Sequence, residues 1–123
     1  MMVISAFAFS SLSPAAFAAQ IVCSGSYYGY DFTVNAKTSK GQVYGSIKLI
    51  VSQNGSVVKE ETLATTGSDI RPGALLNFAG QSQDGSGVIN ASFANGQYSG
   101  NLDAQTSQGD FTMAVTCTME GTP

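Results

Sequence analysis

The sequence predicts an all-β fold, a small antiparallel meander β-barrel of about eight short strands closed by a disulfide bond between its terminal strands. Three observations predict it. Apolar and polar residues alternate with a period of two along most of the chain, which is typical of strands with one buried face. Fourteen glycines, with many Ser, Thr and Asn residues, separate these segments. The only two cysteines lie in the first and last of them. No stretch shows the apolar stripe of an amphipathic helix.

The first residues differ from the rest. Val3 to Ala19 carries no charge and consists mainly of Ala, Phe and Ser. It ends in Ala16-Phe17-Ala18, the small-x-small pattern that signal peptidase requires. We therefore expect residues 1–18 to be a signal peptide and residues 19–123 to be a single β-barrel domain. The n-region expected of a signal peptide lacks a basic residue here. An apolar first strand or helix of the mature fold is therefore the alternative. A run of about 17 apolar residues interrupted by Ser13-Pro14 is marginal for crossing a membrane.

Cys23 and Cys117 are expected to form a disulfide. Val22 precedes Cys23 where a lipoprotein needs a small residue. The chain has no His and the two cysteines are 94 positions apart, so a zinc site is not indicated. A redox Cys-x-x-Cys motif is absent. A disulfide implies an oxidising compartment, so we expect a periplasmic or secreted protein with no membrane span in its mature form.

The alternation and the turn residues divide the mature chain into eight expected strands. Asn54-Gly55 and Asn95-Gly96 are the strongest short hairpin signals in the sequence. Only the connection at 64–73 is longer than a hairpin loop. The expected strands are 21–24, 28–37, 43–52, 57–63, 74–79, 88–93, 97–102 and 110–117.

Closure of this meander is predicted from the cysteines. Ile21 and Cys23 share the parity of Val115 and Cys117, so both sulfurs should point inward and join the terminal strands. A closed barrel also removes the exposed edges of an open sheet. Glycines inside strands, such as Gly45 and Gly100, suit its bends. A β-sandwich is the alternative fold. An outer-membrane barrel is a third option, but its strands need about 9–11 residues each, whereas most of the strands expected here have six to eight.

Composition excludes several functions. The net charge of −3, with 11% charged residues, offers no basic surface for nucleic acid. The chain lacks His and a Gly-x-Ser-x-Gly nucleophile motif. Its eight acidic residues are interpreted as solubilising charges in turns and on outward strand positions. We expect neither an enzyme nor a cofactor or metal site.

Four residues are the candidate binding residues. Alternation from residue 28 places Tyr27 outward at the start of a strand, where an exposed ring can anchor an interface. Tyr44 forms a second outward apolar site beside Ile50. Asp69 and Arg71 lie in the long connection, and loops carry function more often than strands do. The alternative is structural: Tyr27 covers a barrel end, and Asp69 and Arg71 pair with each other.

One short motif resembles a known family. Ser24-Gly25-Ser26-Tyr27-Tyr28 matches the Ser-Gly-x-x-Tyr motif of the periplasmic and membrane-bound inhibitors of c-type lysozyme, which are also small exported barrels. That family has the motif in mid-chain, followed by a Lys-Gly segment that usually holds Trp. This chain has the motif near its start and contains no Trp. The resemblance covers five residues and implies an inhibitor of a protein partner.

The sequence therefore favours an exported binding module that acts through a protein partner, as an inhibitor or envelope accessory protein. The alternative function is a barrel that encloses a small apolar ligand, as lipocalins do. A barrel of few short strands is nearly filled by its own side chains. An open mouth and a cavity would therefore favour the ligand, and an exposed patch would favour the protein partner.

Overall fold

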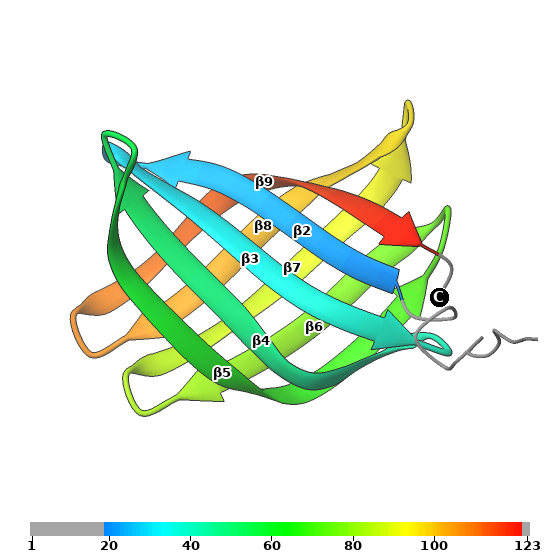
Figure 1. Ribbon diagram of the computed structural model, residues 1–123, viewed down its shortest axis with the longest axis horizontal. Coiled ribbons are helices and arrows are strands. Elements are labelled where there is room, and N and C mark those ends of the chain that lie inside the picture. The colour runs from blue at the N-terminus through cyan, green and yellow to red at the C-terminus, as the bar shows by residue number, and fades with distance from the viewer. Residues whose placement is uncertain (1–18, 122–123) are drawn as a thin grey trace, which may run out of the picture.

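The computed structural model describes residues 19–121, which form one closed β-barrel (Figure 1). Each strand pairs antiparallel with its neighbour in sequence, and the last strand pairs with the first. Closure confirms the meander barrel and excludes the sandwich. The strands are β2 (Ala19–Tyr27), β3 (Tyr30–Ser39), β4 (Gln42–Gln53), β5 (Ser56–Arg71), β6 (Leu75–Ser82), β7 (Gly85–Ala94), β8 (Gln97–Thr106) and β9 (Gly109–Gly121).

The predicted signal peptide, residues 1–18, lies outside the described residues. Within residues 19–121, no helix is long and apolar enough to cross a membrane.

The disulfide joins β2 to β9 where the barrel closes. Cys23 and Cys117 are register partners in the pairing of these two strands, and both are fully buried. The sulfurs therefore point inward, as the parity predicts. A disulfide of this kind is consistent with an oxidising compartment.

The alternation predicts the faces of the barrel. Val34, Ala36, Val43 and Ile47 are buried, whereas the alternating residues Asn35, Lys37, Tyr44 and Ser46 face outward and are mostly polar. Apolar burial on one face is what stabilises such a sheet, at roughly 25 cal/mol per Å² of apolar area removed from water.

Two predictions about the strands are wrong. The expected loop at 64–73 is largely strand, because β5 continues to Arg71 past an irregularity between Thr65 and Gly67. The strands have 8 to 16 residues, whereas six to eight were expected for most of them. Strand length is thus no argument against an outer-membrane barrel. The outward residues do argue against an outer-membrane barrel. Thr33, Asn35 and Lys37 occupy successive outward positions of β3, where such a barrel needs apolar side chains.

The two ends of the barrel differ. The turns 28–29, 54–55, 83–84 and 107–108 gather at one end, here called the mouth, on the left of Figure 1. The end of β9 and the turns 40–41, 72–74 and 95–96 lie at the other, here called the closed end. The largest buried side chains toward that end include Ile21, Leu76 and Phe78. There the backbone N–H of Gly73 donates a 2.8 Å hydrogen bond to the buried Tyr98 hydroxyl.

Candidate ligand-binding site

A cavity of about 710 Å³ occupies the mouth half of the barrel. We call it the cup. It is lined by inward residues of β3 to β9 and reaches the mouth turns at Asp84, Ser107 and Gln108. The bottom of the cup, which we call its floor, is formed by the buried core residues Ile47, Phe78 and Ile89. The volume lies within the range of about 300–1,000 Å³ that small-molecule sites occupy.

Small residues on three adjacent strands create the cup. Gly80 of β6 pairs with Gly87 of β7, and Gly87 pairs with Ala104 of β8. Toward the closed end the same strands contribute large side chains, such as Phe78 and Ile89, to the core. The barrel is therefore filled in one half and hollow in the other because the size of its inward residues changes along β6, β7 and β8.

An aromatic wall lines one side of the cup. Phe32 of β3 and Phe111 of β9 have ring centroids 5.9 Å apart and both line the cavity. Tyr27 of β2 stacks on Phe111 with centroids 4.6 Å apart, which supports the wall from behind. Tyr30 lines the cavity nearer the mouth.

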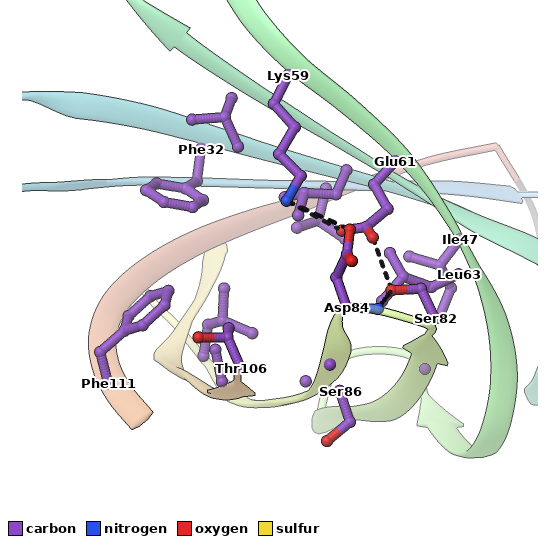
Figure 2. A pocket seen from close by; sticks show the side chains of 18 of the residues that line it. Phe32, Ile47, Lys59, Glu61, Leu63, Ser82, Asp84, Ser86, Thr106 and Phe111 are labelled. Carbon is purple, nitrogen blue, oxygen red and sulfur yellow. Dashed lines mark hydrogen bonds and ion pairs between the residues drawn. The ribbon is translucent and has the colours of Figure 1, made fainter. Parts of the chain in front are cut away.

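A polar cluster faces the aromatic wall from β5 and the β6–β7 turn (Figure 2). The Ser82 hydroxyl donates a 2.7 Å hydrogen bond to a Glu61 carboxylate oxygen. The Lys59 ammonium lies 3.9 Å from the other Glu61 oxygen and 3.7 Å from Asp84. The backbone N–H of Asp84 donates to the Ser82 hydroxyl at 3.2 Å, so the serine connects the turn to Glu61.

Glu61 is the least exposed charged residue of this cluster. Its side chain is 16% exposed, compared with 54% for the neighbouring Glu60, which points outward and pairs with Lys48. The interpretation of Glu61 as a solubilising surface charge is therefore wrong. Alternation provided a signal, because Lys59 and Glu61 share the parity of Leu63, which packs against the core.

The structure does not bring the four candidate binding residues together. Tyr27 points inward and packs against the core, so its predicted outward orientation is wrong. The strand parity breaks at Tyr28 and Gly29, which form the β2–β3 turn with positive φ angles, so the alternation of β3 does not extend back to Tyr27. Tyr28 is 85% exposed.

The other three candidates lie on the outer face toward the closed end. Tyr44 is exposed near the start of β4. The Arg71 guanidinium lies 3.2 Å from Asp69 on the same strand, so these two pair with each other. Neither residue lines the cup. Within residues 19–121, no group of three or more acidic, His or Cys residues is placed to hold a metal ion.

Comparisons with protein-family models, with curated proteins and with solved structures find no match to this chain. The cup combines an apolar floor, an aromatic wall and a small set of convergent polar groups. This combination is typical of sites that bind a molecule with one apolar and one polar part.

Proposed function

We propose that this protein is a non-enzymatic binding protein that takes up a small, largely apolar molecule in the cup. The observation that carries the proposal is the half-filled barrel, with an open cavity of about 710 Å³ above a packed core. Sequence alone favours a protein partner. The cavity favours a small-molecule ligand instead, because an open, largely apolar cavity of this size is not needed to stabilise the fold.

We also propose that the protein acts in the periplasm or outside the cell. The small-x-small motif at Ala16-Phe17-Ala18 and the buried disulfide support this location. N-terminal sequencing of the exported protein tests it, and a start at residue 19 or 20 is expected.

Uptake of a neutral fluorescent probe, N-phenyl-1-naphthylamine, tests the ligand-binding function. The protein is expected to bind one probe molecule. Ala104→Trp fills the cup from its small-residue side and should weaken uptake at least about tenfold, equivalent to about 1.4 kcal/mol. Ala114→Trp is the matched control, because Ala114 is exposed on the outer face of β9.

Circular dichroism establishes that both variants keep the β fold. Absence of uptake by the parent protein, or equal uptake by the two folded tryptophan variants, would overturn the ligand-binding function.

A protein partner is the second candidate, and one observation favours it. Four exposed apolar side chains surround the mouth, namely Tyr28, Tyr30, Val57 and Val58. Exposed apolar patches of this kind mark interaction sites. Tyr28→Asn removes the most exposed ring and suits the turn. It should abolish a partner interaction at the mouth while leaving probe uptake in the cup unchanged.

A further inference from the structure

The acidic residues of this protein are concentrated at the mouth. Four of the eight lie within two residues of a mouth turn or line the cup. In the same region of the described chain, Lys59 is the only basic residue of the mouth turns and cup lining. A field of one sign at the entrance attracts ligands of the opposite sign. The four residues are Asp31, Glu61, Asp84 and Asp110.

Inside the cup the negative charge is only partly balanced. Glu61 and Asp84 contribute two carboxylates, and Lys59 provides one ammonium that lies within 4 Å of both. The polar cluster therefore carries one net negative charge. A ligand carboxylate that approached Lys59 would also meet both acids, whereas a ligand cation would complete the neutralisation.

The geometry of Glu61 suits it to receive that cation. Ser82 fixes one carboxylate oxygen, and the low exposure of the side chain reduces screening by water. Lys59 is half exposed, so its ammonium can move into solvent and leave the Glu61 carboxylate to the ligand. Long lysine side chains readily adopt such positions.

The aromatic wall suits the remainder of such a ligand. Phe32 and Phe111 face the polar cluster across the cup (Figure 2). Phe111 comes from β9, which is opposite β5 in the barrel, and Phe32 comes from β3, two strands away from β5. Their rings offer apolar contact to a hydrocarbon body. Ring faces also attract cations, at roughly 0.5–2 kcal/mol depending on exposure, and they do not attract carboxylates.

We propose that the cup binds an amphiphile with a cationic head, an alkylammonium or arylalkylammonium compound, whose head lies at Glu61 and Asp84 and whose apolar body packs on Phe32 and Phe111. This inference rests on the proposed ligand-binding function and names the chemical class of the ligand. It follows from the charge balance of the cup together with the position of the rings.

Displacement of N-phenyl-1-naphthylamine by three ten-carbon compounds tests the inference. Decylamine, decanol and decanoate share one apolar chain and differ only in the head. Decylamine should displace the probe at a concentration about tenfold or more below that of decanoate, with decanol between them. Added salt should reduce the difference between the displacing concentrations of decylamine and decanoate, because it screens the charges.

Two variants locate the effect. Glu61→Gln keeps the shape of the side chain and should reduce the preference for decylamine over decanoate at least about threefold. Glu60→Gln is the matched control, since it removes the adjacent outward carboxylate and should leave the preference unchanged. Asp84→Asn, in an exposed turn, should reduce the preference even if Glu61→Gln does not fold.

The outcomes are distinguishable from those of the preceding proposal. Probe uptake with equal displacement by all three compounds, or with decanoate preferred, would overturn the cationic head and leave the apolar site intact. A preference that is the same in Glu61→Gln, Asp84→Asn and Glu60→Gln would also overturn it. Lack of probe uptake would overturn the ligand-binding function itself.

Discussion

Gly100 shows how a single residue permits the close approach of two strands. It pairs with Ala91, and a Cβ atom at this position would overlap the backbone carbonyl oxygen of Asn90 on β7. Backbone atoms in a closed barrel have little freedom to move away, because both strands are also paired on their other sides. The sequence indicates a special role for Gly100 as a glycine within an alternating strand. The structure gives the reason, which is contact with backbone.

Gly100→Ala is therefore expected to lower the free energy of unfolding by about 1–3 kcal/mol, the usual cost of overpacking that displaces backbone. Gly67→Ala is the matched control. Gly67 also lies within a strand, but a Cβ there meets no atom within 4 Å and its φ is not in the left-handed region. Urea denaturation of both variants measures the difference. Equal stability of the two would show that β7 and β8 separate without cost.

The residues of the cup show what a sequence conveys about a site. Parity along 57–63 could place Lys59 and Glu61 on the inward side. It could not show that they lie in a cavity, because that depends on Gly80, Gly87 and Ala104, which reach the same place from strands 20 to 45 positions later in the chain. The inward direction of Tyr27 could have been predicted from Ile21 and Cys23, which share its parity within β2. The prediction failed because the alternation of residues 28–37 was extended back across the Tyr28-Gly29 turn.

The hairpins were the most predictable elements. Asn54-Gly55 and Asn95-Gly96 form turns with positive φ at both residues, as their sequences predict. Tyr28-Gly29 and Lys40-Gly41 adopt the same conformation with an unfavourable first residue. In these two turns, the glycine and the alternation of the flanking strands outweigh the unfavourable first residue. The extent of β5 was not predictable, because its last residues pair across an irregularity and the N–H of Ile70 bonds to Gly41 from another hairpin.

Lys40 offers a test of this turn chemistry. Its φ of 55° lies in the left-handed region, where Asn is much better tolerated than Lys. Lys40→Asn is expected to raise the free energy of unfolding by about 0.5–1 kcal/mol.

Tyr28→Asn serves for comparison. It relieves the same backbone strain, at a φ of 48°, but removes a ring whose centroid lies 4.5 Å from that of Tyr27. The increase in the free energy of unfolding should therefore be smaller than for Lys40→Asn. Thermal unfolding of both variants measures this. A gain from Tyr28→Asn that matches the gain from Lys40→Asn would mean that the contact between the two tyrosines contributes nothing.

At the scale of the whole molecule, the residues that stabilise the barrel and the residues that line the cup lie in different halves. The closed half holds the large buried side chains, the Tyr98 hydrogen bond and the fully buried disulfide. The mouth half holds the cup, where small residues leave space and charged groups lie inside the barrel. Stability and binding should therefore respond to different changes.

Reduction of the disulfide is the clearest test of this division. The bond closes a loop of 94 residues, and the chain-entropy model assigns such a cross-link roughly 4.5 kcal/mol. Most small domains are stable by only about 5–15 kcal/mol, so the reduced protein should unfold at a much lower urea concentration than the oxidised protein. Neither cysteine lines the cup, so reduced protein that is still folded should bind N-phenyl-1-naphthylamine as tightly as the oxidised form. Ala104→Trp should show the opposite behaviour, with weak probe binding and a urea midpoint close to that of the parent. A reduced protein that is folded but has lost probe binding would show that the cup depends on the disulfide between β2 and β9. Stability and binding would then not be separate properties of the two halves.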